Sequence, residues 1–173
     1  MDAVTQSRPV NPLKSLVVVA IFTALSAAGG LIKFPSPVGS IAFDSAPGYF
    51  VAGFFSPLLG GIAGAFGHIV SAGIAGFPLA VAHIPIAVMQ FVWCFLFGFI
   101  IRRANSVPGL VGASVVAILA NGVVAPLILG LIFPQFRSML TTLIPFLLAA
   151  SAINVIIAAV AVKFLSRLDI PGL

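Results

Sequence analysis

The stretch SAPGYFVAGFFSPLLGGIAGAFGHIVSAGIAGFPLAVAHIPIAVMQFVWCFLFGFII, residues 45–101, decides the fold of this chain. It contains no Lys, Arg, Asp or Glu over 57 residues and lies between Asp44 and Arg102. As a single helix it would be about 86 Å long, whereas the hydrocarbon core of a bilayer is about 30 Å thick. The stretch therefore predicts about three membrane passes, with turns at Ser56-Pro57 and Gly76-Phe77-Pro78.

The composition of the whole chain also indicates a membrane protein. Hydrophobic residues make up 61% of it and charged residues 6%, against about 25% charged residues in soluble domains. The N-terminal apolar stretch continues into further apolar segments and does not resemble a cleavable signal peptide. Cys94 is the only cysteine, which predicts no disulfide and makes a poor metal site. The net charge of +5 is concentrated at segment ends, so it does not indicate nucleic-acid binding.

Charged residues and Pro- or Gly-rich stretches divide the rest of the chain. We predict an all-α fold, a single membrane domain over residues 1–173 that is an integral bundle of six transmembrane helices. A loop is predicted at 33–44, KFPSPVGSIAFD. The second segment is short for a full span, so we expect it to be tilted or covered by protein. A β-barrel is not expected, because the segments are apolar on every face. The approximate segments are 15–32, 46–56, 58–75, 79–101, 109–132 and 138–162.

Six passes place both termini on the same side of the membrane. If that side is the cytoplasm, the outer face carries only Lys33 and Arg137, and the positive-inside rule is satisfied. We therefore predict a multi-pass protein of the cell membrane with both termini cytoplasmic. The basic residues of the inner face are then Arg8, Lys14, Arg102, Arg103, Lys163 and Arg167.

Polar residues within membrane segments are costly and mark functional sites. At their predicted depths most of them fall in the outer half of the bundle. This pattern predicts a cup that opens outward above an apolar floor, since a channel would need polar groups at every depth. Aromatic residues near the rim predict aromatic walls for a small-molecule site: Phe43, Tyr49, Phe50, Phe77 and Phe136. The candidate substrate-binding residues are Asp44, Ser45, Tyr49, His68, Phe77, His83, Gln90 and Asn121.

Structural roles for the same residues stay open. Asp44 could cap the helix that follows it, and His68 could bond a neighbouring carbonyl. His83 could be solvated at the interface, and amides such as Gln90 commonly join membrane helices. For Asn154, which is expected deeper toward the inner side, joining helices is the favoured role.

The first segment carries a stripe of small residues at every fourth position, Ala20, Ala24 and Ala28. Such stripes let another helix approach closely. The stripe predicts either packing inside the bundle or a docking face for a partner protein.

The layout and two groups of residues carry a family resemblance. A chain of this size with six apolar segments and an Ala stripe in the first resembles the S-components of energy-coupling factor (ECF) transporters, the membrane subunits that capture vitamins. Residues 37–49, PVGSIAFDSAPGY, together with Gly67-His68 and Gly76-Phe77-Pro78-Leu79, resemble the group assigned to α-ribazole, a cobalamin precursor.

The resemblance implies a transport subunit and not an enzyme. An S-component binds its substrate from outside, docks on a transmembrane coupling protein driven by two ATPases, and is thought to topple in the membrane. Ala20, Ala24 and Ala28 would form the docking face, and the loop at 33–45 would act as a lid. The chain lacks a Gly-x-x-x-x-Gly-Lys-Ser/Thr loop, so it cannot hydrolyse ATP by that route. No catalytic residue, cofactor, metal or nucleic acid is expected.

Three alternatives remain open at this point. The substrate could be another aromatic vitamin, such as riboflavin or thiamine. Asp44, His68 and His83 could instead serve an intramembrane metal-binding enzyme or metal carrier, because two imidazoles and a carboxylate can hold a divalent metal. The chain could also be a structural membrane subunit without a ligand.

Overall fold

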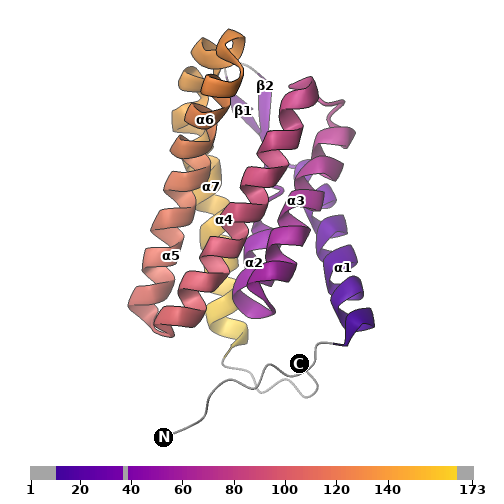
Figure 1. Cartoon of the computed structure of the whole chain (residues 1–173), viewed down its shortest axis with the longest axis vertical. Helices are drawn as coiled ribbons and strands as arrows, with labels where there is room; N and C mark the ends of the chain where they lie inside the picture. The colour runs from indigo at the N-terminus through magenta and orange to yellow at the C-terminus, as the bar shows by residue number, and fades with distance from the viewer. Residues whose placement is uncertain (1–10, 37–38, 167–173) are drawn as a thin grey trace, which may run out of the picture.

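The computed structural model describes residues 11–36 and 39–166, which form an upright bundle of helices (Figure 1). Short irregular helices interrupt or join the long ones: η1 and η3 are 3-10 turns, and η2 is a π-helical turn within a longer helix. In chain order the elements are α1 (Pro12–Gly30), β1 (Lys33–Ser36), β2 (Gly39–Ala42), α2 (Ala46–Phe54), α3 (Pro57–Ile74), η1 (Ala80–Ala82), α4 (His83–Ala104), α5 (Val107–Leu119), η2 (Ala120–Val124), α6 (Ala125–Ile132), η3 (Pro134–Phe136) and α7 (Arg137–Leu165).

The helices begin and end at local signals in the sequence. The side chain of Asn11 accepts a hydrogen bond from the Leu13 amide at the start of α1, and Ser106 does the same for Gly109 at the start of α5. Between α3 and α4, Gly76 and Phe77 have φ angles of 79° and 50°. This left-handed backbone reverses the chain at the predicted turn.

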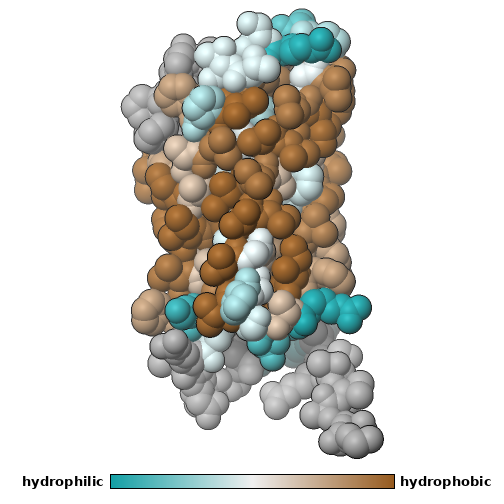
Figure 2. All heavy atoms as spheres, turned by 90° about the vertical axis from the view of Figure 1, so that its left-hand side faces the viewer, coloured by the Kyte–Doolittle hydropathy of each residue, from teal (hydrophilic) through white to brown (hydrophobic). Residues whose placement is uncertain are grey.

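The predicted all-α membrane fold is confirmed. Among the described residues, five helical segments are long and apolar enough to cross a membrane. Figure 2 shows one face of the bundle as a band of hydrophobic surface, with hydrophilic atoms concentrated toward its two ends. This is the distribution expected for a protein that sits in a bilayer. The five segments are Pro12–Gly30, Pro57–Ile74, Ala80–Ala104, Val107–Ile132 and Pro134–Leu165.

The second predicted segment differs from the other five. Helix α2 has nine residues, so it is only about 14 Å long and covers about half of a bilayer core. It lies in the half of the bundle away from the β1–β2 hairpin (Figure 1). The chain therefore crosses here by a non-helical stretch followed by a half-length helix. Such a backbone is tolerated at membrane depth only where protein surrounds it.

The predicted loop at 33–44 contains a two-stranded antiparallel hairpin. Lys33 pairs with Ala42, and Ser36 pairs with Gly39. Pairing the strands satisfies backbone groups at the edge of the bundle, which explains why this Pro- and Gly-rich stretch is ordered as β-structure.

Small residues hold α2 tightly between α3 and α4. A Cβ atom on Gly48 would lie 2.7 Å from the Cα atom of Gly64, and one on Gly60 or Gly98 would collide with the backbone of Ala52. Glycine at these positions lets the helices approach closely. Around α2 the bundle has an apolar core that includes Tyr49, Ala52, Cys94, Phe97, Val155 and Ala158.

Helix α1 begins and α7 ends at the same end of the bundle, as an even number of crossings requires (Figure 1). The described basic residues of the predicted inner face, Lys14, Arg102, Arg103 and Lys163, belong to helix ends on this side. Arg8 and Arg167 lie outside the described residues. The assignment of this end to the cytoplasm stays a prediction.

Cysteine labelling tests the orientation. Ser36→Cys in β1 and Ser106→Cys before α5 stand at opposite ends of the bundle, so they should react with a membrane-impermeant thiol reagent from opposite faces of the membrane. In intact cells only Ser36→Cys should be labelled, and Ser106→Cys should react after the membrane is opened. Cys94 is fully buried and provides the background control. Labelling of Ser106→Cys alone in intact cells would show that the orientation is opposite to the predicted one.

Candidate functional site: a cavity with a polar floor

A cavity of about 380 Å³ lies between α3, α4, α6 and α7, above the start of α2. Its size falls within the range of about 300–1,000 Å³ that is usual for small-molecule sites. It occupies the half of the bundle nearer the hairpin (Figure 1). The lining residues are Asp44, Ser45, His68, Ser71, Ala72, Ala75, Pro78, Leu79, His83, Ile86, Met89, Gln90, Asn121, Ala125, Pro126, Leu129, Met139, Leu140, Leu143, Leu147, Ala150, Ser151 and Asn154.

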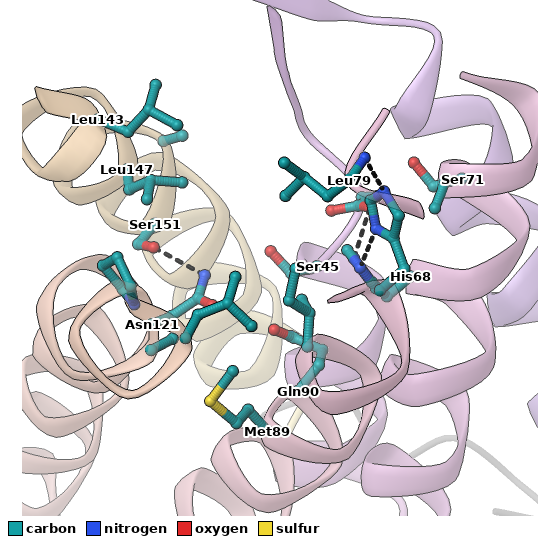
Figure 3. Close-up of a pocket in the computed structure, with 18 of the residues that line it drawn as sticks. Ser45, His68, Ser71, Leu79, Met89, Gln90, Asn121, Leu143, Leu147 and Ser151 are labelled. Atoms are coloured by element: carbon teal, nitrogen blue, oxygen red, sulfur yellow. Dashed lines mark hydrogen bonds and ion pairs between the residues drawn. The ribbon is translucent and has the colours of Figure 1, made fainter. Parts of the chain in front are cut away.

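The floor of the cavity is polar. Helices α4 and α7 run away from the hairpin end, whereas α3 and α6 run toward it (Figure 1). On each of these paths through the cavity, the lining residue farthest from the hairpin end has a polar side chain. Figure 3 shows this order on α7, where Leu143 and Leu147 lie above Ser151. The deepest lining residues are His68, Gln90, Asn121 and Asn154, and Ser45 joins them at the start of α2.

This arrangement corrects the predicted apolar floor. The sequence placed Asp44 and Ser45 at the outer face, but α2 begins in the middle of the bundle, so both residues reach the cavity from below. The apolar layer that the sequence indicated is present one level deeper, as the core around Tyr49 and Phe97.

The walls are mainly aliphatic, with Ser71 and His83 as polar residues on the side of α3 and α4. Leu, Ile and Met side chains line the cavity, and none of its described lining residues is Phe, Tyr or Trp. Tyr49 is fully buried in the core, where its ring lies 5.4 Å from that of Phe97. The rings of Phe77 and His83 meet edge to face with their centroids 5.7 Å apart, and Phe77 is not among the lining residues. The structure therefore places six of the eight candidate residues in the cavity lining, whereas Tyr49 and Phe77 lie behind it.

Asn154 joins α7 to the start of α2. Its side-chain oxygen accepts a hydrogen bond from the Ala46 amide at 2.9 Å, and its nitrogen donates to the Ala150 carbonyl at 2.9 Å. The N-cap residue of α2 is Ser45, whose side chain makes no capping bond. The cap therefore comes from a distant helix and not from Asp44. Asn154 joins helices as expected, but it lies at the cavity floor and not on the inner side.

Asn121 is placed by the π-helical turn η2. Pro126 cannot donate to the carbonyl four residues earlier, which accounts for an irregular turn just before it. Gly122 lets this turn approach α7, since a Cβ there would lie 2.8 Å from the Cα atom of Leu148. The Asn121 amide then donates to the Ser151 hydroxyl at 2.8 Å (Figure 3).

A chain of contacts joins one corner of the floor to the α3–α4 turn (Figure 3). Nδ1 of His68 lies 3.6 Å from Oδ2 of Asp44. Nε2 of His68 lies 3.1 Å from Nδ1 of His83, and Nε2 of His83 accepts a hydrogen bond from the Leu79 amide at 3.2 Å. All four imidazole nitrogens thus face a protein group.

This geometry does not favour the metal-binding alternative. Among residues 11–36 and 39–166, no group of three or more His, Cys, Asp or Glu side chains is arranged to hold a metal ion. Each histidine nitrogen that could bind a metal already faces another group in the Asp44–His68–His83–Leu79 chain.

Sequence reasoning missed Ser151 and Asn154 as cavity residues. They are three apart and therefore share a face of α7. Their spacing is a usable signal, but the depth of α2 had to be known before that face could be assigned to the cavity.

The Ala stripe lies on the surface. Ala20, Ala24 and Ala28 are exposed, whereas Ser26 and Gly30 on the same helix are buried. A Cβ atom on Gly67 of α3 would lie 2.5 Å from the Ser26 hydroxyl oxygen, so the buried face of α1 packs on α3. Packing inside this bundle is therefore not the role of the stripe.

The fold and the cavity define a membrane-embedded helical bundle that encloses a solute-sized site. The family profile "ECF transporter, substrate-specific component" matches residues 14–166, and the chain belongs to this family. It is therefore a component of a membrane transporter, and the family implies a small-molecule substrate and an ECF module as partner.

A solved structure agrees with this assignment at the level of the fold. The S component of a bacterial ECF transporter superposes with a TM-score of 0.62 and 16% sequence identity, over 91% of this chain and 95% of that chain. No curated protein sequence matches the chain significantly.

Removing the distant cap should destabilise the bundle. Asn154→Ala leaves the partly buried Ala46 amide without its acceptor, which should cost about 1–2 kcal/mol of unfolding free energy. The measurement is reversible unfolding of the purified protein in mixed detergent micelles. Ser114→Ala serves as the control, because among the described residues the Ser114 hydroxyl bonds the Leu110 carbonyl of its own helix and joins no other helix. Equal stability of the two variants would show that the cap contributes little.

Proposed function

We propose that this chain is the S-component that captures α-ribazole from outside the cell and delivers it inward with an ATPase-driven ECF coupling module. The observation that carries the proposal is the cavity, whose polar floor and aliphatic walls match a ligand with one hydroxyl-rich end and one apolar end. α-Ribazole, a dimethylated aromatic base on a ribose, has this division.

The floor suits the ribose. Its hydroxyl groups can both donate and accept, and the floor offers a carboxylate from Asp44, amides from Gln90 and Asn121 and the hydroxyl of Ser45. These groups come from three parts of the fold, the start of α2, α4 and η2, so they can surround a compact polar group from several directions.

The walls suit the methylated base. Leu143 and Leu147 lie above the floor (Figure 3), and apolar contacts there would hold a flat ring in place. Met89 and Met139 also line the cavity, and methionine sulfur packs favourably on aromatic rings. A base held by aliphatic and Met side chains replaces the aromatic stacking that the sequence suggested.

The charge of the cavity favours an unphosphorylated substrate. None of its described lining residues is Lys or Arg, and Asp44 contributes a carboxylate. A phosphate group would lack the basic partners that usually bind it and would face this carboxylate. The site therefore fits the nucleoside better than its phosphate.

For delivery, the exposed stripe of Ala20, Ala24 and Ala28 is the proposed docking face for the transmembrane coupling protein. The hairpin region at 33–45 is the proposed lid, because its last two residues, Asp44 and Ser45, line the cavity. Both termini are proposed to be cytoplasmic.

Substitutions at the floor test the site. Asp44→Ala and His68→Ala should each weaken α-ribazole binding by about tenfold or more. Asp44→Ala removes a hydrogen bond to a buried ligand, which costs about 1–3 kcal/mol, and His68→Ala removes the imidazole that orients the Asp44 carboxylate. Titration calorimetry on the purified protein measures this effect, with Ser114→Ala on α5 as the control. Undiminished affinity in both floor variants would show that the cavity floor is not the binding site.

Titration of the wild-type protein with α-ribazole, riboflavin and thiamine tests the substrate. The proposal expects binding of α-ribazole. Binding of another of these vitamins in its place would keep the S-component role and replace the substrate.

The stripe is tested by Ala24→Leu. The larger side chain should prevent close approach of a coupling-protein helix, so transport by the reconstituted complex should fall at least about tenfold while α-ribazole binding to the isolated subunit is retained. Ala149→Leu on α7 makes the same change at another exposed alanine and should transport normally. Normal transport by Ala24→Leu would exclude the stripe as the docking face.

A further inference from the structure

We infer that His83 is a positioning residue, which fixes the proton arrangement of His68 and thereby presents Asp44 to the ligand as a hydrogen-bond acceptor. The inference starts from the Leu79 amide. Because a backbone N–H can only donate, Nε2 of His83 at 3.2 Å must be unprotonated.

The remaining protons follow in sequence. A neutral His83 carries its proton on Nδ1, which donates to Nε2 of His68 at 3.1 Å. Nε2 of His68 is then the acceptor, so its proton is on Nδ1, which faces the Asp44 carboxylate at 3.6 Å. One backbone amide thus sets the tautomer of both rings, and the N–H groups all point toward Asp44.

A third proton would break this arrangement. Placed on Nε2 of His83, it would face the Leu79 N–H; placed on Nε2 of His68, it would face the Nδ1–H of His83. Either state puts two donors against each other and loses one hydrogen bond. The observed contacts therefore require one proton on each ring, and a third proton would break at least one of them.

The groups that face the two rings come from three elements. Asp44 approaches from the stretch before α2, His68 from α3 and His83 from α4. The described cavity residues on α6 and α7 are uncharged. Asp44 is thus the charged group that orients the pair, and its carboxylate has acceptor capacity beyond the contact with His68.

This arrangement specifies the ligand at this corner of the floor. The group that meets Asp44 must be a hydrogen-bond donor, such as a hydroxyl or an amine, and carboxylates or phosphates are rejected. This part rests on the proposed function, because it takes the cavity to be the substrate site, whereas the tautomers can be tested without any ligand.

Nitrogen NMR tests the tautomers directly. The chain has only two histidines, so histidine-selective ¹⁵N labelling of the full-length protein in lipid nanodiscs gives signals from His68 and His83 alone, and single Gln variants assign them. At neutral pH both rings should be Nδ1–H tautomers. An Nε2–H tautomer on either ring would overturn the inference.

Binding of α-ribazole as a function of pH tests the consequence. Wild-type affinity should fall over the pH range in which the NMR signals report a third proton. His83→Leu breaks the series of contacts from Leu79 to Asp44, so this variant should bind α-ribazole about tenfold more weakly at neutral pH. His83→Gln can accept from Leu79 and donate to His68, so it should lose less than His83→Leu. Thermal unfolding confirms that both variants are folded.

The outcomes separate the two proposals. If α-ribazole does not bind and the NMR signals show the Nδ1–H tautomer on both rings, the proposed substrate is wrong and the inference about His83 and His68 is supported. If α-ribazole binds equally well to the wild type and both His83 variants at every pH, the function stands and the role of His83 is refuted. Equal losses in the Gln and Leu variants would also refute it, because shape and not hydrogen bonding would then matter.

Discussion

The structure depends on burying the beginning of a half-length helix in the middle of a membrane bundle. The first amides of any helix lack partners within the helix, and in an apolar interior each unpaired amide is costly. Asn154 supplies an acceptor from α7 at 2.9 Å, and its own amide is held by the Ala150 carbonyl. Polar side chains from the neighbouring helices gather at the same level, and together they form the cavity floor.

The half-length helix also divides the bundle into two functional halves. Below the floor, Gly48, Gly60 and Gly98 let α2 fit tightly between its neighbours, and the core is apolar. Above it, no helix of the described part of the chain takes the place of α2, and the space between α3, α4, α6 and α7 remains open as the cavity. A full-length second helix would fill that space. The short length of α2 therefore places its first backbone amides, which lack partners within the helix, inside the membrane, and the same short length creates the site.

Sequence identity of 16% to a solved S component, with a TM-score of 0.62, shows that the architecture tolerates extensive substitution. Many different sequences can form this fold, because it requires small residues where helices pack closely and apolar residues on the lipid-facing surface. The substrate must then be argued from the particular side chains of the floor, where Asp44, His68 and His83 form a chain with a defined hydrogen-bond direction. That chain ends at a backbone amide, so side-chain chemistry at the site is tied to the conformation of the α3–α4 turn.

The amino-acid sequence was sufficient to predict the membrane class, the long helices and most of their turns. A charge-free run that is longer than a bilayer core is thick must fold back within the membrane, which indicates a bundle of helices. Ser56-Pro57 and Gly76-Phe77 indicate turns because their local backbone geometry ends or reverses a helix. It also indicated Asp44, His68 and Gln90, because polar groups in apolar segments require partners. The depth of α2 came only from the tertiary structure, and it places Tyr49 in the core and Asn154 and Ser151 at the floor. The packing of α1 on α3, which leaves Ala24 on the surface, was equally absent from the sequence. The depth of a helix in the membrane, and the direction in which each of its faces points, depend on how helices distant in sequence pack together. The periodicity within one segment carries no information about which helices lie beside it.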